Sequence, residues 1–222
     1  MKLAIFCDFD GTITQNDTLQ FLLDHYVGDA WNEVEDKVEA GLLPEKEALQ
    51  LEMDFLKVDE KSAFEALDKN IKIDETFKDF TNWCKEHNFE LIVLSGGFRK
   101  IIEFVFQKNY IGSIKIYSND FFVDSKNKWK VIPSNSPKIN GLCNHCKTFH
   151  LEEIRTNFDK IVYIGDGTTD RCPAQKSDWV FAKKGLAKFL GEKNFPFFEF
   201  RDFAEIKSKL ELLTDKKLEE SN

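Results

Sequence analysis

The chain has 222 residues, of which 42% are hydrophobic and 32% charged, a composition typical of a globular protein that buries a full core. Its formal net charge of −8 argues against nonspecific nucleic-acid binding, which needs a basic surface. An acid follows the first seven residues, too early for a signal peptide, and no apolar run is long enough to span a bilayer. We therefore expect a cytoplasmic protein that does not bind membranes. Its five cysteines, an odd number, disfavour a disulfide framework.

The first part of the chain is interpreted as one short strand followed by helices. Residues 3–6 are apolar and predict a buried strand. Asp17 suits the cap of the first of the helices that follow, and Pro44 suits the first turn of the third. The four helical patterns span residues 17–27, 30–41, 44–58 and 60–70. Because they stand between the first and second strands, we interpret residues 15–71 as an inserted helical lid.

Strand and helix patterns alternate through the rest of the chain. Most of the strands are short continuous apolar runs, as expected of parallel strands that are buried on both faces. The expected strands are 89–95, 113–118, 160–166, 178–182 and 195–200, and the expected helices include 74–87 and 98–109. Residues 121–132 predict a hairpin, and the charged tail 214–222 is expected to fray. This alternation predicts a doubly wound α/β sheet.

Polar side chains that carry chemistry follow the expected strands. Ligands of open α/β sheets bind at the carboxyl ends of the strands. These ends carry Asp8 and Asp10, then Ser95 with Gly96 and Gly97, and then Asp166 and Asp170, while Lys147 begins a predicted helix. The sequence therefore predicts that four carboxylates, a hydroxyl and one lysine meet at one edge of the sheet.

These residue types suit the chemistry of a phosphate ester. Clustered carboxylates repel one another unless a cation neutralises them, and hard oxygen ligands favour Mg²⁺. A hydroxyl, the N–H groups of a glycine pair and a lysine suit a phosphoryl group. One aspartate is able to attack phosphorus, and a second, two residues further on, is able to exchange a proton with the leaving group and with water.

The stretch Asp8-Phe9-Asp10-Gly11-Thr12, with Ser95, Lys147 and Gly165–Asp170, resembles the four motifs of the haloacid dehalogenase (HAD) superfamily, in the family's order and over nearly the whole chain. The resemblance implies a three-layer α/β Rossmannoid core, residues 1–14 and 72–222, with an all-helical C1 cap at 15–71. Asp10 favours phosphoryl transfer over dehalogenation, because a halide leaves without a proton.

The same resemblance implies a role for each matching residue. Asp8 forms an aspartyl-phosphate, and Asp10 is the general acid and then the base. Ser95, Gly96 and Lys147 hold the phosphoryl oxygens. Mg²⁺ is bound by the Asp8 carboxylate, the Asp10 main-chain carbonyl and Asp166, and Asp170 supports the metal without binding it directly. The substrate is a small phosphorylated metabolite.

Two subfamilies share further stretches with this chain. The "SGGF" at 95–98 resembles that of the phosphoserine phosphatases, but Asp17 stands where those enzymes usually carry a glutamate. The "CNHCK" at 143–147 and the "DFDGTITQND" at 8–17 look like 2-hydroxy-3-keto-5-methylthiopentenyl-1-phosphate phosphatase, an enzyme of methionine salvage. A related branch acts on phosphoethanolamine, phosphocholine or pyridoxal phosphate. The leaving group stays open among these.

Several interpretations remain open from the sequence. Lys138 is a second candidate for the motif lysine. Cys143, His145 and Cys146, with Cys172 or His150, suit either a zinc site or a loop packed beside Lys147, and a reversible Cys143–Cys146 disulfide is a third reading. Asp17 is either a helix N-cap or a reader of the substrate, and Arg99 either reaches the substrate or is exposed.

Alternatives of function and assembly also stay open. A phosphotransferase would pass the phosphoryl group to an alcohol in place of water, and an inactive HAD-fold protein would bind without catalysis. Either a monomer or a homodimer fits the sequence.

Overall fold

The computed structural model describes residues 1–134 and 145–219. Within them, one seven-stranded sheet has the order β4-β3-β2-β1-β5-β6-β7. The strands are β1 (Leu3–Cys7), β2 (Glu90–Phe98), β3 (Lys115–Val123), β4 (Trp129–Ile132), β5 (Lys160–Gly165), β6 (Trp179–Ala182) and β7 (Phe198–Glu199). Neighbouring strands run parallel, except for the antiparallel hairpin of β3 and β4. The predicted doubly wound sheet and its hairpin are confirmed.

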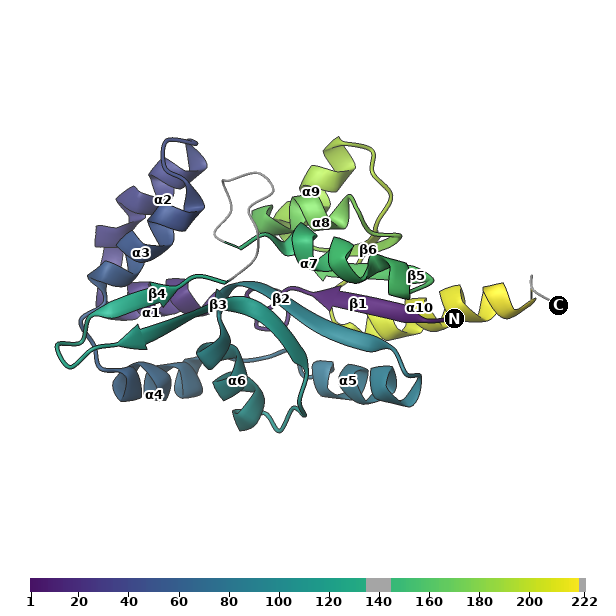
Figure 1. Cartoon of the computed structure of the whole chain (residues 1–222), viewed down its shortest axis with the longest axis horizontal. Coiled ribbons are helices and arrows are strands. Elements are labelled where there is room, and N and C mark those ends of the chain that lie inside the picture. The colour runs from purple at the N-terminus through teal and green to yellow at the C-terminus, as the bar shows by residue number, and fades with distance from the viewer. Residues whose placement is uncertain (135–144, 220–222) are drawn as a thin grey trace.

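Helices cover both faces of this sheet, which makes three layers. Figure 1 shows α5 and α6 below the sheet and α7, α8 and α9 above it. The helices after β1 are α1 (Thr18–Tyr26), α2 (Asn32–Glu39), α3 (Glu45–Phe55), α4 (Glu60–Asn70), α5 (Phe77–Glu86) and α6 (Arg99–Lys108). Those that follow β4 are α7 (Lys147–Ile154), α8 (Arg171–Ala174), α9 (Lys184–Glu192) and α10 (Phe203–Glu219).

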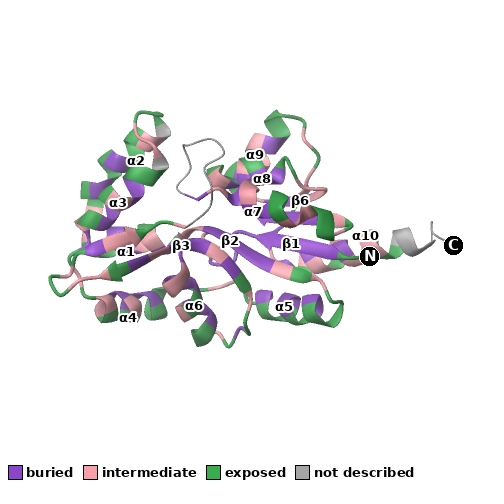
Figure 2. Cartoon of the chain, viewed as in Figure 1, coloured by how far each residue is buried: buried purple, intermediate pink, exposed green. Residues whose placement is uncertain are grey.

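Two apolar clusters lie on opposite faces of the sheet, and successive side chains of β1 point alternately into one cluster and the other. Leu3 and Ile5 belong to the cluster with α5, α6 and α10, whereas Ala4 and Phe6 belong to the cluster with α7, α8 and α9. Figure 2 shows β1 buried along its whole length. Continued past β1, this alternation of side chains places Asp8 on the α7 side of the sheet.

The four helices expected within residues 15–71 are present as α1 to α4, and they pack around the hairpin. Figure 1 shows α2 and α3 above β4 and α4 below it, beside α6. The Gln50 side chain of α3 pairs with β4 as a strand would: it donates to the Trp129 carbonyl at 3.1 Å and accepts from the Val131 N–H at 2.9 Å. Trp129 is fully buried in an apolar cluster that also holds Leu22 and Met53. The inserted helices therefore share a core with the sheet.

Three boundaries differ from the expectation. The expected strand at 113–118 and the first arm of the hairpin form one strand, β3, which begins at Lys115; the buried Asn119 side chain donates to the Gly96 carbonyl instead of starting a turn. β7 has only two residues, and Pro196, which lacks an N–H, precedes it at the sheet edge. Pro44 is the N-cap of α3 and does not lie in its first turn.

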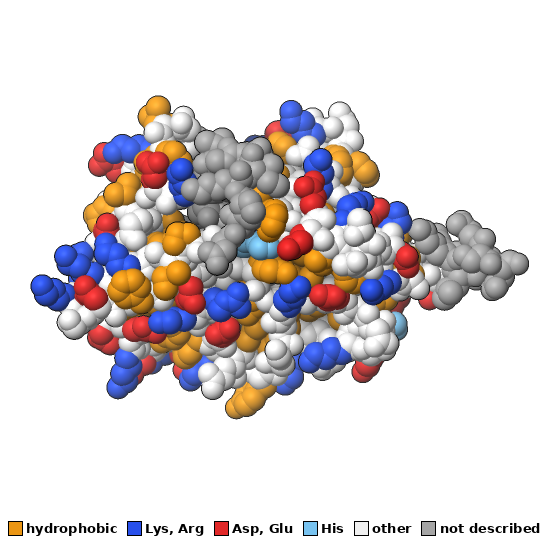
Figure 3. Space-filling view, in the orientation of Figure 1, with side chains coloured by type: hydrophobic (Ala, Val, Ile, Leu, Met, Phe, Trp, Pro, Cys, Tyr) orange, Lys and Arg blue, Asp and Glu red, His pale blue; other side chains and the backbone are white. Residues whose placement is uncertain are grey.

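At the C-terminal end, residues 214–219 of the tail that was expected to fray belong to a helix. α10 runs to Glu219, anchored by Phe203, Ile206 and Leu210, which are fully buried. None of the described helices combines the length and the apolar character that a bilayer crossing requires. On the face drawn in Figure 3, the acidic and basic side chains of the described residues are interspersed.

Candidate active site

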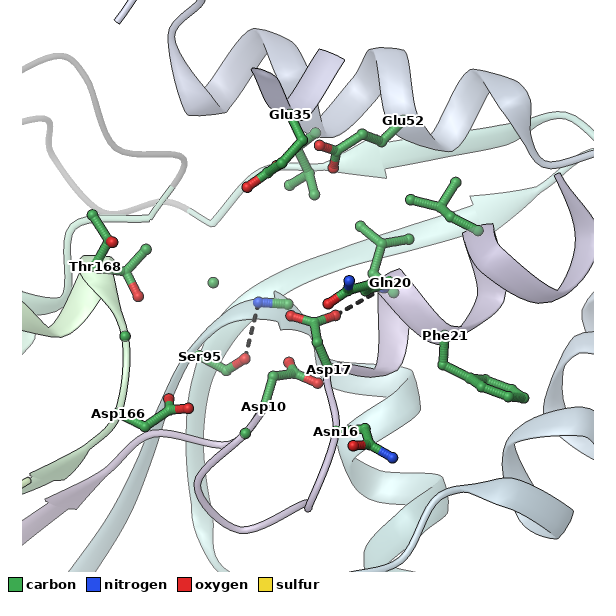
Figure 4. Close-up of a pocket in the computed structure, with 18 of the residues that line it drawn as sticks. Asp10, Asn16, Asp17, Gln20, Phe21, Glu35, Glu52, Ser95, Asp166 and Thr168 are labelled. Atoms are coloured by element: carbon green, nitrogen blue, oxygen red, sulfur yellow. Dashed lines mark hydrogen bonds between the residues drawn. The ribbon is translucent and has the colours of Figure 1, made fainter. Parts of the chain in front are cut away.

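A cavity of about 840 Å³ opens at the carboxyl ends of the central strands. Figure 4 shows its two sides: Asp10, Ser95 and Asp166 point into it from the sheet, and Glu35 and Glu52 point into it from α2 and α3. The structure therefore brings polar side chains together at this edge of the sheet, as expected. The inserted helices form the opposite wall.

A buried charge network lies under the cavity. The Lys147 Nζ atom, at the start of α7, lies 2.5 Å from Asp8 Oδ1 and 2.7 Å from Asp170 Oδ1. The Tyr163 hydroxyl donates to the same Asp170 oxygen at 2.6 Å. Burial, together with the nearby Asp170, raises the pKa of Asp8 well above its usual value. Two buried carboxylates share one ammonium here, so an added cation would stabilise their ionised forms.

The Asp166 carboxylate completes a group of oxygen atoms. Oxygens of Asp8, Asp166 and Asp170 lie within 4.8 Å of one another, the only such group of potential ligands among the described residues. Asp166 Oδ1 accepts from the Thr12 hydroxyl at 3.2 Å, and its Oδ2 accepts from Lys184 Nζ at 2.9 Å. An all-oxygen donor set of this kind fits Mg²⁺.

Asp10 lies beside this group, and its carboxylate faces the start of α1. Its Oδ1 accepts from both the N–H and the hydroxyl of Thr18, at 2.8 and 2.7 Å. Desolvation raises the pKa of Asp10 to about 7, although the Thr18 hydrogen bonds favour the ionised form. A carboxyl with this pKa is able to give and to take a proton near neutral pH. Its carboxylate is not part of the three-aspartate group.

The Ser95 loop forms the neighbouring part of the wall. Ser95 is buried, and its Oγ accepts from the Gly97 N–H at 2.9 Å, as Figure 4 shows. The Ser95 carbonyl pairs with His145 Nδ1 at 2.8 Å, which ties the end of β2 to the segment before Lys147. A Cβ atom at Gly97 would lie 2.7 Å from Asp10 Oδ2, so only glycine allows Asp10 to come this close.

The structure distinguishes Asp17 from Arg99, the two candidate substrate residues outside the motifs. Asp17 is the N-cap of α1, accepting from the Gln20 N–H at 2.9 Å, and it also lines the cavity, so both readings remain compatible. Arg99 does not line the cavity. Its guanidinium donates to the Ile116 carbonyl at 2.6 Å and lies near Glu103.

The structure describes only some of the cysteines and histidines that the sequence suggests as zinc ligands. Cys143 and Lys138 lie outside the described residues. Among the residues that are described, no group of histidines and cysteines comes together as metal ligands would. His150 stacks on Tyr117 with ring centroids 3.9 Å apart, and burial lowers its pKa to about 4. His150 therefore packs as a neutral aromatic ring.

Among the residues whose side chains contact the site aspartates, three are absent from the sequence interpretation: Thr18, Tyr163 and Lys184. Tyr163 had a detectable signal, since a buried tyrosine hydroxyl in an apolar strand needs a partner. Thr18 follows a capping residue, and Lys184 lies in a lysine pair, which are both common arrangements. No sequence spacing relates either of them to Asp10 or Asp166.

A doubly wound sheet with carboxylates, a lysine and a hydroxyl gathered at one edge is the arrangement of a Rossmann-like hydrolase. Residues 5–175 match the haloacid dehalogenase-like hydrolases, and the chain belongs to that family.

Three relatives match nearly the whole chain. Pdp3-interacting factor 1 of Schizosaccharomyces pombe is 32% identical, with 96% of each chain covered. Polyol phosphate phosphatase of Saccharomyces cerevisiae is 29% identical, covering 93% of this chain and 91% of its own. The 2-hydroxy-3-keto-5-methylthiopentenyl-1-phosphate phosphatase of Bacillus cytotoxicus is 27% identical, covering 98% and 100%.

A solved structure supports the fold. A phospho-aspartyl intermediate analogue of phosphoserine phosphatase superposes with a TM-score of 0.73 at 23% identity, covering 94% of this chain and 98% of that one. The expected HAD fold and the resemblance to the phosphoserine phosphatase group are confirmed.

Proposed function

We propose that this protein is a Mg²⁺-dependent phosphatase that hydrolyses a small phosphate monoester through an aspartyl-phosphate intermediate. One observation carries the proposal: Asp8, in the group of three carboxylates, is paired with Lys147 directly beside Asp10, whose pKa is raised to about 7. A nucleophile, a cationic contact for phosphate and a proton carrier thus meet at one place. The family and the phosphatases among its relatives support the reaction class.

The proposed metal ligands are the Asp8 and Asp166 carboxylates and the Asp10 carbonyl, with Asp170 holding the site together. Asp170 Oδ2 accepts from the N–H groups of Asp166 and Gly167, each at 3.0 Å, so it orders the loop that carries Asp166. When bound, Mg²⁺ neutralises the carboxylates and the charge of the transferring phosphoryl group.

In the first proposed step, an Asp8 carboxylate oxygen bonds to phosphorus and the bond to the leaving oxygen breaks. Asp10 enters protonated and gives its proton to the departing alkoxide. Lys147 and the Ser95 loop contact the phosphoryl oxygens. The Thr18 hydrogen bonds then stabilise the carboxylate that Asp10 has become.

In the second step, water attacks phosphorus of the aspartyl-phosphate. Asp10, now ionised, takes the proton from that water, and the bond between phosphorus and Asp8 breaks, which releases phosphate and restores both aspartates. The same carboxyl thus serves as acid and base, as a pKa close to neutral pH allows.

Residues 15–71 are proposed as the cap that selects the leaving group. Its side of the cavity carries carboxylates and amides together with the apolar side chains of Trp31 and Leu49. The polar members are Gln15, Asn16, Asp17, Gln20, Asp24, Glu35 and Glu52. Such groups form hydrogen bonds with hydroxyls, which supports polyol phosphates as the first substrates to test. The methionine-salvage enol phosphate is the second candidate, supported by the Bacillus relative.

Asp8→Asn tests the reaction class. With p-nitrophenyl phosphate and Mg²⁺, we expect phosphate release by the wild type to exceed that of the variant by about a thousandfold or more, because the amide is a poor nucleophile. Asp79→Asn, an exposed change on α5, is the matched control and should keep full activity. Substantial turnover by Asp8→Asn would overturn the assignment of the nucleophile.

A substrate panel then separates the leaving groups. It contains sorbitol 6-phosphate, the methionine-salvage enol phosphate, phosphoserine, phosphoethanolamine and pyridoxal phosphate, each compared by kcat/KM. Adding an alcohol acceptor distinguishes hydrolysis from phosphotransfer: transfer in excess of phosphate release would make the protein a phosphotransferase.

A further inference from the structure

Lys184 holds an unusual position for a lysine at the start of a helix. It is the first residue of α9, and its backbone has a φ of +48°, which is rare for a residue with a side chain. Its side chain is 53% exposed and lines the cavity. Among the described residues that line the cavity, Lys184 is the only lysine or arginine. A strained backbone at such a place requires a compensating contact.

That contact is with the group that would bind the metal. Lys184 Nζ lies 2.9 Å from Asp166 Oδ2 and donates to the Gly11 carbonyl, also at 2.9 Å. With Thr12 on Oδ1, both oxygens of Asp166 already have a donor. A cation that binds Oδ2 therefore meets the ammonium of Lys184 at the same oxygen, where the two positive charges repel each other.

The arrangement is also specific to Lys184. The preceding residue, Lys183, reaches the same loop, but it contacts the Thr12 carbonyl at 3.3 Å and stacks over Phe200. It forms no ion pair with Asp166. Variants of the two neighbouring lysines therefore distinguish the effect of a cation that contacts the Asp166 carboxylate from the effect of a cation that is only near it.

From these contacts we propose that Lys184 is a positioning residue that takes the place of the metal on Asp166, and that Mg²⁺ binds by displacing its ammonium from Oδ2. Before the metal binds, the ion pair holds Asp166 in place and offsets part of the negative charge of the three carboxylates. When the metal binds, the ammonium moves into the cavity, where its exposed side chain has room. This inference rests on the proposed function for the presence of a metal.

The proposal predicts the sign of a change in metal affinity. Removing the ammonium removes both a competitor and a positive charge close to the cation. Lys184→Met should therefore bind Mg²⁺ about tenfold more tightly than the wild type, by calorimetric titration of metal-stripped protein at fixed pH and ionic strength. Saturating Mg²⁺ should also raise its melting temperature by more than it raises that of the wild type.

Three variants serve as controls. Lys184→Gly also lacks the ammonium but relieves the positive φ, so tighter binding in both neutral variants belongs to the charge and not to backbone strain. Lys184→Arg keeps the charge, and Lys183→Met removes the neighbouring one; both should bind Mg²⁺ within about threefold of the wild type.

The titration also keeps the two proposals apart. Unchanged or weaker Mg²⁺ binding in both neutral variants would overturn the displacement and would show that Lys184 simply supports Asp166. A wild type that binds no Mg²⁺ would instead overturn the metal assignment of the proposed function, and this inference with it.

Discussion

At the residue scale, the pair of Asp10 and Thr18 decides when the first step is possible. Asp10 must be protonated to serve as the acid, and desolvation raises its pKa to about 7. The Thr18 hydroxyl donates to the ionised carboxylate and so opposes that rise. The rate of the first step should therefore fall as the pH rises above this pKa.

Thr18→Val tests this balance. The variant loses the hydroxyl but keeps the backbone N–H, so the pKa of Asp10 should rise and the alkaline fall of kcat/KM should move upward by about half to one pH unit. The measurement is kcat/KM from pH 5 to 9. Thr214→Val, on α10 far from the cavity, is the control and should leave the profile unchanged. A shift toward acid would contradict the assignment of Asp10 as the acid.

At the element scale, the end of β2 approaches Asp10 so closely that one methyl group would not fit. In Gly97→Ala the new Cβ atom would lie 2.7 Å from Asp10 Oδ2 and 3.2 Å from Ser95 Oγ. We expect kcat/KM to fall by about tenfold or more, because both groups must move.

Gly191→Ala is the matched control for that change. No atom lies within 4 Å of the new Cβ, and the position is inside α9. This variant should keep its activity and gain about 0.4–1 kcal/mol of unfolding free energy. Equal activity of the two glycine variants would show that Asp10 tolerates displacement.

Also at this scale, Gln50 joins α3 to the hairpin through both its amide atoms. Gln50→Leu leaves the Val131 N–H and the Trp129 carbonyl without these partners, at a cost of about 1–3 kcal/mol. Urea unfolding measures the loss, with Gln107→Leu, exposed on α6, as the control. Hydrogen exchange at Val131 should speed up in Gln50→Leu alone. An unchanged midpoint would mean that α3 and β4 are held together by apolar contacts only.

At the scale of the whole molecule, the carboxylates of the site make stability depend on pH. The pKa values of Asp8 and Asp10 are raised in the folded protein, so between about pH 5 and 8 the folded state binds more protons than the unfolded chain. In EDTA the unfolding free energy should therefore fall as pH rises through this range, by about 1–3 kcal/mol.

Urea unfolding at several pH values tests this. Added Mg²⁺ should reduce the fall, because a cation favours the ionised carboxylates, and Asp10→Asn should show a smaller fall in EDTA than the wild type. Stability that rises from pH 5 to 8 in EDTA would contradict the sign of both shifts.

The alternating apolar strands, the hairpin and the four inserted helices follow from local pattern, because period and turn chemistry are properties of neighbouring residues. The local sequence pattern predicted the wrong strand boundary where a side chain bonds to a residue distant in sequence. Asn119 looks like a turn former, yet it continues β3 through its bond to Gly96.

The sequence points to six residues of the site because motif spacing places each of them at a strand end or a helix start. Strand ends share one edge of a parallel sheet. The six are Asp8, Asp10, Ser95, Lys147, Asp166 and Asp170. What only the tertiary structure decided is which atoms meet across long separations in sequence: Lys184 on Asp166, Tyr163 on Asp170 and Gln50 on β4. It also decided that Arg99 turns away from the cavity. These contacts depend on packing and side-chain reach, which no local pattern encodes.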